Sequence, residues 1–258
     1  MTSILYHGEP NGPSLSVIAA AFETGVEVVL QRIDLVAGDR HGAAVPHAME
    51  VDQSIEGEGP VLVVDGVAMT DSVFLACYFD DIGHSTALRP TDPYARWQMM
   101  AWCRYVIERL APAAAYLGLH AAPPVAVPAG IASIDLAERW RDAVEGRFDE
   151  PKLTDSHAKV SAAAEKIEAQ LADARDWLMG EFGIADLETY AWLAGMPALV
   201  PAAFADKPLT ASWLARVAAR PSVVRTLALA SVPSPERIWA PGPEIRSEEH
   251  TSELQSRT

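Results

Sequence analysis

The sequence predicts a small α/β domain followed by an all-α domain. Three observations lead to this fold class. A strand, a helix and a second strand alternate near the start of the chain, a proline-led hairpin runs directly into an amphipathic helix over residues 59–82, and the apolar patterns beyond residue 92 have helical spacing. With 258 residues, of which 50% are hydrophobic and 21% charged, the chain can bury a substantial core.

The first domain opens with residues 4–6 as a strand, residues 14–25 as a helix and residues 26–33 as a second strand. Apolar side chains recur on one face of the helix, at Leu15, Ile18, Ala19 and Phe22. A strand, a helix and a strand in this order predict a right-handed crossover between parallel strands.

The segment 59–82 carries the most specific pattern of the chain. Pro60 can enter a strand only at its start or edge, and Asp65-Gly66 is a strong signal for a tight hairpin turn. Asp71-Ser72 ends the second strand and caps a helix that ends near Gly83. The free N–H groups at such a helix start form an anion site.

The second domain begins at Asp92-Pro93, a cap followed by proline at the first helical position. Helical spacing predicts helices over residues 93–110, 131–145, 155–180 and 213–221, with a proline-rich break at Pro123, Pro124 and Pro128. We therefore expect a first domain at 1–83, a linker at 84–92, a helical domain at 93–232 and a tail at 233–258. Within the tail, residues 246–256 resemble the translation of a common short-read sequencing adapter, so they enter no functional argument.

Charge and composition narrow the class of partner. The formal net charge of −15 disfavours nucleic acid and anionic membrane surfaces. The sequence shows no apolar leader and no apolar run as long as a membrane span, so we expect a cytoplasmic protein. Cys77 and Cys103 lie in helical patterns and form no C-x-x-C pair, so neither a disulfide framework nor a metal site is indicated.

Pro60, the hairpin, Asp71 and Ser72 have the spacing of the glutathione site of glutathione transferases, and the chain resembles this family from about residue 4 to residue 230. The resemblance implies a thioredoxin-like first domain with a cis-proline at Pro60, an all-α second domain, and glutathione as cosubstrate. It also places a helix cap at Gly183, where the family usually has serine or threonine, with Asp186 reaching back to the turn.

The resemblance implies that the site must favour the thiolate of glutathione, because a free thiol with a pKa of about 8.5 is mostly protonated at neutral pH. Ser14, at the start of the first helix, is the candidate donor to the thiolate, and Tyr6 is the alternative. Pro13 stands where the beta class of the family carries cysteine, so thiol exchange chemistry is disfavoured.

Other residues are implied in binding glutathione. Gly59 stands where most relatives have valine, and its backbone is expected to pair with the cysteinyl amide next to Pro60. Ser72 suits the γ-glutamyl carboxylate and Asp71 the ammonium group. The remaining candidates are Asn11, Arg40, His41, His47 and Gln53. Glu56 and Glu58 would repel an anionic tripeptide unless they point to solvent, so glutathione binding is expected to be weak.

The electrophile is expected to bind among aromatic and sulfur side chains of the second domain, namely Trp97, Met100, Trp102, Tyr105 and Tyr116. The segment 88–102 and the spacing from Leu5-Tyr6 to Ser14-Leu15 look most like bacterial β-etherases, which displace an aryloxy group with glutathione. A non-catalytic binding or interaction module of this fold and a glutathione-dependent isomerase or dehalogenase remain as alternatives. We expect a homodimer, because the last helix of the first domain and the first helix of the second expose apolar surface.

Overall fold

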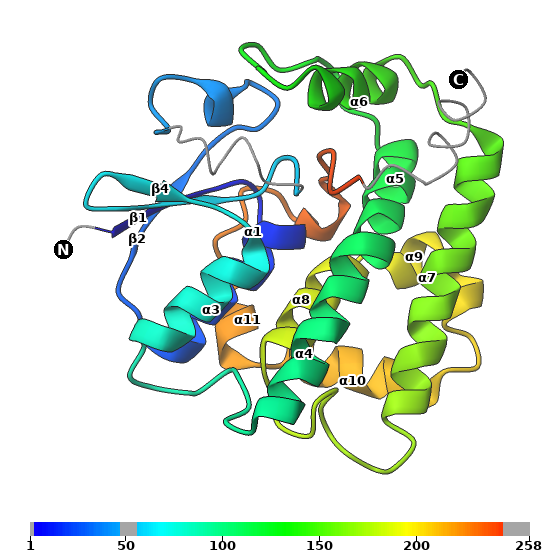
Figure 1. Cartoon of the computed structure of the whole chain (residues 1–258). Coiled ribbons are helices and arrows are strands. Elements are labelled where there is room, and N and C mark those ends of the chain that lie inside the picture. The colour runs from blue at the N-terminus through cyan, green and yellow to red at the C-terminus, as the bar shows by residue number, and fades with distance from the viewer. Residues whose placement is uncertain (1–2, 47–55, 245–258) are drawn as a thin grey trace, which may run out of the picture.

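The structure is a computed structural model that describes residues 3–46 and 56–244. Within these residues the first domain has a four-stranded sheet in the order β2-β1-β3-β4 (Figure 1). The strands are β1 (Ser3–His7), β2 (Val29–Arg32), β3 (Val61–Val64) and β4 (Val67–Met69). β1 pairs with β2 in parallel and with β3 antiparallel, and the hairpin between β3 and β4 turns at Asp65 and Gly66, both of which have positive φ. The predicted crossover and hairpin are confirmed.

Helices α1 (Gly12–Thr24) and α3 (Ser72–Ile82) lie on one side of the sheet (Figure 1). Leu5 and Leu62 belong to the large core cluster on the helix side, whereas Val61 and Val63 form a smaller cluster with residues of the other side. The strand predicted over residues 26–33 is shorter than expected, because α1 ends in a left-handed turn at Gly25 and the N–H of Val26 still donates to the carbonyl of Ala21.

The rest of the described chain is helical. Its elements are α4 (Pro93–Tyr105), the π-helical turn η2 (Val106–Leu110), α5 (Ala111–Ala121), α6 (Ile134–Val144), α7 (Glu150–Gln170), α8 (Ile184–Leu193), α9 (Met196–Leu199), α10 (Pro208–Ala218) and α11 (Pro221–Leu227). Short 3₁₀ turns occur at η1 (Asp39–His41), η3 (Pro201–Ala203) and η4 (Pro235–Arg237). The fold is therefore an α/β domain followed by an all-α domain, as the sequence predicts.

Two predicted helix boundaries were wrong. The helix that begins at Pro93 continues beyond residue 110 through η2 into α5, because a wider π turn accommodates Pro112, which lacks an N–H group. The helix predicted over 155–180 instead spans Glu150–Gln170. Asp149 accepts from the N–H of Lys152 and so starts it earlier, and the chain then turns away through Ala174, which has positive φ.

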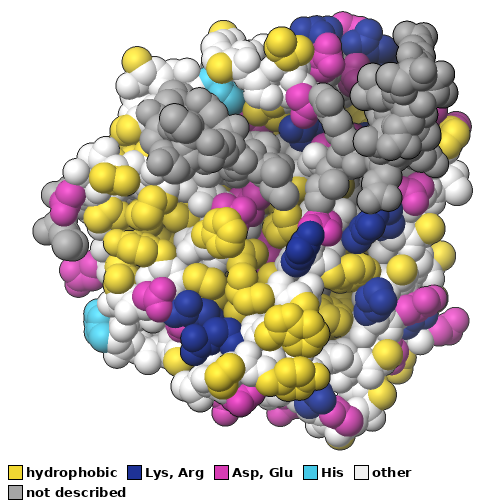
Figure 2. Space-filling model, in the orientation of Figure 1, with side chains coloured by type: hydrophobic (Ala, Val, Ile, Leu, Met, Phe, Trp, Pro, Cys, Tyr) yellow, Lys and Arg dark blue, Asp and Glu magenta, His cyan; other side chains and the backbone are white. Residues whose placement is uncertain are grey.

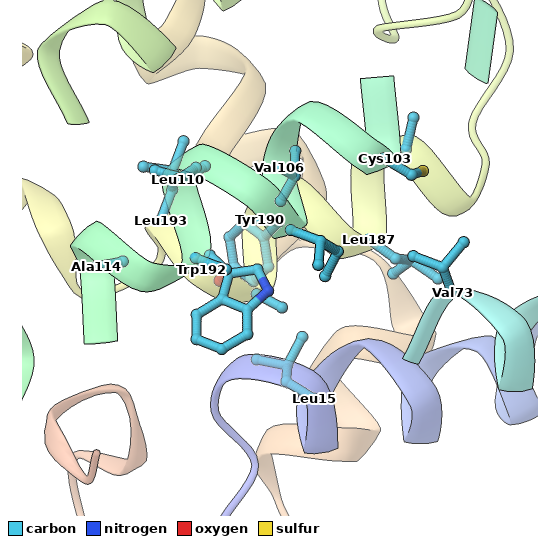
Figure 3. Close-up of a cluster of buried hydrophobic side chains, with 14 of the residues drawn as sticks. Leu15, Val73, Cys103, Val106, Leu110, Ala114, Leu187, Tyr190, Trp192 and Leu193 are labelled. Atoms are coloured by element: carbon cyan, nitrogen blue, oxygen red, sulfur yellow. The ribbon is translucent and has the colours of Figure 1, made fainter. Parts of the chain in front are cut away.

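Helix α8 occupies the centre of the molecule, and each of its ten residues is buried. It packs against α1, α3, α4, α5 and α10. Figure 3 shows Leu187, Tyr190, Trp192 and Leu193 of α8 among side chains of α1, α3 and the continuous α4-η2-α5 helix. The core is therefore shared by the two domains. No helix in the described part of the chain is long and apolar enough to cross a membrane.

Asp186 organises the start of α8, and the predicted cap is confirmed. Its carboxylate accepts hydrogen bonds from the backbone N–H groups of Gly183 (3.1 Å) and Leu178 (3.0 Å) and from Nε1 of Trp213 (2.8 Å). Burial nevertheless raises the pKa of Asp186 to about 6.

This shift predicts a pH dependence of stability. Because the pKa of Asp186 is about 6 in the folded protein and 3.8 in its ordinary state, the folded state holds this proton more tightly than the unfolded chain. The contribution of Asp186 to the free energy of unfolding is thus fully present below pH 4. It is lost as the pH rises through about 6, and the loss amounts to at most about 3 kcal/mol. Urea unfolding at a series of pH values gives the unfolding free energy as a function of pH. Between pH 4 and 6 this free energy should fall less steeply for Asp186→Asn than for the wild type.

The matched control is Asp155→Asn, which removes an exposed carboxylate of α7 that pairs with Lys159 one turn later in the same helix. It should leave the pH slope of the unfolding free energy unchanged. An Asp186→Asn protein with the slope of the wild type would show that another buried acid causes the pH dependence.

Candidate functional site

A cavity of about 250 Å³ lies where the start of α1, the loop before β3, α6, α8 and the C-terminal segment meet. Here "the C-terminal segment" means residues 231–244. The lining residues are Glu9, Asn11, Gly12, Pro13, Ser14, Arg32, Ile33, Asp34, Leu35, Val36, Glu56, Glu58, Trp140, Trp192, Ser231, Val232, Ile238, Trp239, Ala240, Pro241 and Gly242. Both domains therefore contribute walls to one cavity.

Ser14 lies in the first turn of α1 and is buried at this cavity. Extended backbone at Asn11 and proline in the first turn start the helix here, so the positive end of the helix lies at the cavity. The N–H of Gly8 donates to Oγ of Ser14 at 3.1 Å. Because Oγ accepts this bond, the hydroxyl proton of Ser14 is left for another acceptor.

Tyr6, the alternative thiol partner, lies elsewhere. Its side chain is half-buried and packs against the smaller core cluster with Val61 and Val63, and Tyr6 does not line the cavity. The alternation of side chains along β1 explains this position, because Leu5 faces the helices and its neighbour must face the opposite side of the sheet.

The N-terminus of α3 does not line the cavity, but Ser72 at this helix start is bonded to Glu56, which does. Asp71 caps the helix by accepting from the N–H of Phe74 at 3.2 Å, and it has φ of 79°. Ser72 is fully buried, and both its backbone N–H (2.7 Å) and its hydroxyl donate to Oε1 of Glu56. The carboxylate of Glu56 therefore occupies the donors that the sequence assigns to the γ-glutamyl carboxylate.

Three carboxylates gather near this helix start. Glu188 of α8 accepts from Ser16 (2.9 Å) and from Nε1 of Trp192 (2.8 Å). Burial raises the pKa of Glu188, of Asp71 and, strongly, of Glu56, where the charges of Asp71 and Glu188 add to the effect. The site consequently resists the addition of further negative charge.

Glu58 is also buried, so neither Glu56 nor Glu58 points to solvent. Its Oε1 lies 2.9 Å from Nε2 of His41 and accepts from Nε1 of Trp140 at 2.7 Å. Arg40 lies 3.9 Å from Oε2 of Glu58 and donates from Nε to the carbonyl of Gly59 at 2.8 Å. Positive charge and an indole donor thus hold Glu58 inside.

The cis peptide implied at Pro60 was wrong, because the described residues contain no cis peptide bond. The carbonyl of Gly59 is held by Arg40, and the carbonyl of Pro60 accepts from the hydroxyl of Thr70 at 2.8 Å. These contacts fix the backbone on both sides of the bond in the trans form, which is also the form that X–Pro bonds favour.

The C-terminal segment closes the cavity. Nδ2 of Asn11 donates to the carbonyl of Ile238 at 3.1 Å, and the N–H of Glu58 donates to the carbonyl of Pro241 at 3.2 Å. Trp239 is buried against α5 so closely that a Cβ on Gly118 would overlap its ring. Residues 233–244, which the sequence assigns to a tail, therefore form a wall of the site.

The structure does not bring the five predicted electrophile-binding residues to this cavity. Trp97 is 62% exposed, and Met100 and Tyr105 pack against the large core cluster. Trp102 donates to the hydroxyl of Thr189 at 2.9 Å, and the hydroxyl of Tyr116 accepts from the N–H of Asp149 at 2.7 Å. Four of these side chains thus have partners within the helical domain, whereas Trp97 is exposed.

Three tryptophans that sequence reasoning did not single out line the cavity. Trp140 of α6, Trp192 of α8 and Trp239 of the C-terminal segment line the cavity, and the rings of Trp192 and Trp239 stack with centroids 6.4 Å apart. Trp192 follows Glu188 by four residues on a helix, a spacing that could have indicated the bond between them. No local pattern marks Trp140 or Trp239. His47 and Gln53 lie outside the described residues.

Comparisons with known proteins agree with this architecture. Residues 121–221 match the family model described as "Glutathione S-transferase, C-terminal domain". Protein LigF of Sphingobium sp. strain NBRC 103272 / SYK-6 is 25% identical over 246 residues, which cover 86% of this chain and 92% of LigF.

Solved structures show the same fold. The crystal structure of the β-etherase LigF from Sphingobium sp. strain SYK-6 has a TM-score of 0.78 at 22% identity, with 88% of this chain and 99% of LigF covered. A glutathione transferase family member from Pseudomonas fluorescens pf-5, solved with two glutathione molecules bound, has a TM-score of 0.66 at 19% identity, with 88% and 92% covered. The chain is therefore similar to glutathione transferases in its helical domain, over residues 121–221, and it has the fold of the solved glutathione transferases.

Proposed function

We propose that this protein is a glutathione transferase that activates the thiol of glutathione for attack on an apolar, aromatic electrophile. The observation that carries the proposal is the position of Ser14, whose hydroxyl lies at the start of α1 on the same cavity as Trp140, Trp192 and Trp239. A thiol-activating group and an aromatic binding surface thus share one site.

Ser14 is proposed to donate its hydroxyl proton to the thiolate sulfur. Gly8 fixes the oxygen through its N–H, so the proton is directed away from Gly8. A hydrogen bond to the charged form and the positive end of α1 both lower the pKa of a nearby thiol. The carboxylates of the site raise the pKa of a nearby thiol. The hydrogen bond from the Ser14 hydroxyl must therefore lower this pKa by more than it would in a site without charges.

Cleavage of β-aryl ethers is the leading specific reaction, because LigF, a β-etherase, is similar in sequence and fold. In this reaction the thiolate sulfur bonds to the carbon that carries the aryloxy group. The C–O bond breaks as the C–S bond forms, and the released aryloxide takes a proton from water. The tryptophan walls suit the two aromatic groups of such an ether.

Polar atoms of the cavity favour an electrophile that also carries hydroxyl groups. Oδ1 of Asn11, Oε2 of Glu58 and Nε1 of Trp239 are buried and have no hydrogen-bond partner among residues 3–46 and 56–244. All three residues line the cavity. A hydroxyl can both donate to the oxygens and accept from the indole, which would remove the cost of leaving these groups unsatisfied.

For glutathione itself, we propose that Asp71 and Ser72 contact the γ-glutamyl group and that the backbone at Gly59 and Pro60 contacts the cysteinyl part, with Asn11 nearby. His41 is bound to Glu58, so its contribution is indirect. We further propose a cytoplasmic location, in keeping with the unpaired Cys77 and Cys103.

We also propose a homodimer through α3 and α4. Figure 2 shows hydrophobic side chains gathered over the face that carries these helices. Phe74 and Ile82 of α3 are 64% and 48% exposed, and Tyr94 and Trp97 of α4 are 65% and 62% exposed. Large apolar side chains on adjoining helices of one face are typical of a protein interface.

The first test replaces Ser14 by alanine. Loss of a charge-assisted hydrogen bond should raise the pKa of bound glutathione by about one unit. Turnover at neutral pH should fall about tenfold and recover in part as the pH rises. The measurements are the pH profile of turnover and the ultraviolet absorbance of the bound thiolate. Tyr6→Phe is the control, and a shift in that variant with none in Ser14→Ala would assign the role to Tyr6.

The second test concerns the aromatic wall. Trp239→Ala should lower kcat/KM for an aryl ether about tenfold, because a stacking surface is lost, whereas Trp239→Phe should restore most of it. Tyr105→Leu, at a predicted binding residue outside the cavity, serves as the control and should leave kcat/KM unchanged. Equal losses in Tyr105→Leu and Trp239→Ala would mean that the electrophile binds along α4 instead.

The third test concerns assembly. Light scattering should give twice the chain mass for the wild type and one chain mass for Phe74→Glu, because a carboxylate cannot be buried unpaired in an apolar interface. Val125→Glu, at an exposed apolar residue outside α3 and α4, is the control and should remain dimeric. A wild type with the mass of one chain would refute the dimer.

A further inference from the structure

Glu56 fills the anion site at the start of α3 from within the chain. Its Oε1 receives both the backbone N–H and the hydroxyl of Ser72, and the side chain is 1% exposed. These two donors are the ones that a carboxylate ligand at this helix N-terminus would need.

We propose that Glu56 is an intramolecular competitor of the γ-glutamyl carboxylate, and that it thereby sets the affinity and selectivity of the site for its thiol cosubstrate. The proposal rests on the glutathione-dependent function proposed above. Two carboxylates cannot share the Ser72 donors, so glutathione must displace Glu56 or bind without its γ-glutamyl carboxylate in this position.

The charges around Ser72 make displacement costly. Asp71 lies directly before Ser72, and Glu188 of α8 lies close enough to act on Glu56 electrostatically. Bringing a further carboxylate beside these buried acids places negative charge in a site that already disfavours it. The wild-type protein should therefore gain little binding energy from the γ-glutamyl group.

Gly59 supplies independent support for this role. A Cβ at residue 59 would lie 2.8 Å from Oε2 of Glu56 and 3.4 Å from its Cβ. The absence of a side chain at Gly59 thus leaves the space into which Glu56 folds. A larger residue at this position would push Glu56 away from Ser72 without changing Glu56 itself.

The test compares two thiols, glutathione and cysteinylglycine, which lacks the γ-glutamyl group. Isothermal titration should show less than a threefold difference in Kd between them for the wild type. Glu56→Ala vacates the donors and should bind glutathione at least tenfold more tightly, with cysteinylglycine unchanged. Glu56→Gln removes the charge but keeps an acceptor oxygen, so its gain should be smaller.

Two further variants separate competition from general electrostatics and from misfolding. Glu188→Gln removes a nearby buried charge but leaves Glu56 on Ser72, so any selective gain for glutathione should be smaller than in Glu56→Ala. Gly59→Ala should repeat the selective gain of Glu56→Ala, and thermal unfolding confirms that each variant is folded. Unchanged or weaker glutathione binding in folded Glu56→Ala, or equal gains for both thiols, would overturn the proposal.

Turnover measured on the same variants distinguishes a failure of this proposal from a failure of the proposed function. Glutathione-dependent turnover of an aryl ether together with no selective gain in Glu56→Ala would reject the competitor role alone. Absence of both turnover and glutathione binding in every variant would reject the transferase function, and the competitor role with it.

Discussion

Burial of α1 between the sheet, α3 and α8 is the constraint on which the rest of the structure depends. Leu15 and Ile18 are fully buried, and the small side chains of residues 19–21 allow the neighbouring helices to approach closely. Because α1 is held on every side, its first turn has a fixed position at the boundary between the two domains. Ser14 therefore meets side chains of the helical domain in one cavity, although it belongs to the α/β domain. The packing of α1 thus builds the hydrophobic core and also fixes the position of Ser14 at the cavity.

The junction is also rich in buried carboxylates, which is unusual for a core. Each has specific donors: Glu188 has Ser16 and Trp192, and Glu23 of α1 accepts from both Arg220 and Ser222. These bonds join the two domains through polar contacts that have strict geometry, so they select one arrangement of the domains. Of these acids, Glu188 lies near Glu56, so the proposed competition of Glu56 with an anionic tripeptide takes place beside other buried carboxylates.

Local patterns explain why much of the fold was predictable. The turn at Asp65-Gly66, the cap at Asp71 and the bond from Asp186 to Gly183 each depend on residues within a few positions of one another. The inward fold of Glu56 depends on Ser72, 16 residues away, and on the open space at Gly59. Burial of Glu58 depends on Trp140, 82 residues away. Such contacts follow from tertiary packing, so the sequence alone could not decide whether these two acids face solvent or the interior.

The difference between local patterns and contacts made over a long stretch of chain also applies to the candidate site. Ser14 and Ser72, which we propose contact glutathione, lie at helix starts and so have local signals. The tryptophan walls come from α6, α8 and the C-terminal segment, and Trp239 is positioned by the absence of a side chain at Gly118 in α5. A segment beyond the last long helix thus forms part of the cavity, so the proposed thiol partner Ser14 and the proposed electrophile wall come from parts of the chain that are far apart in sequence but meet in one cavity.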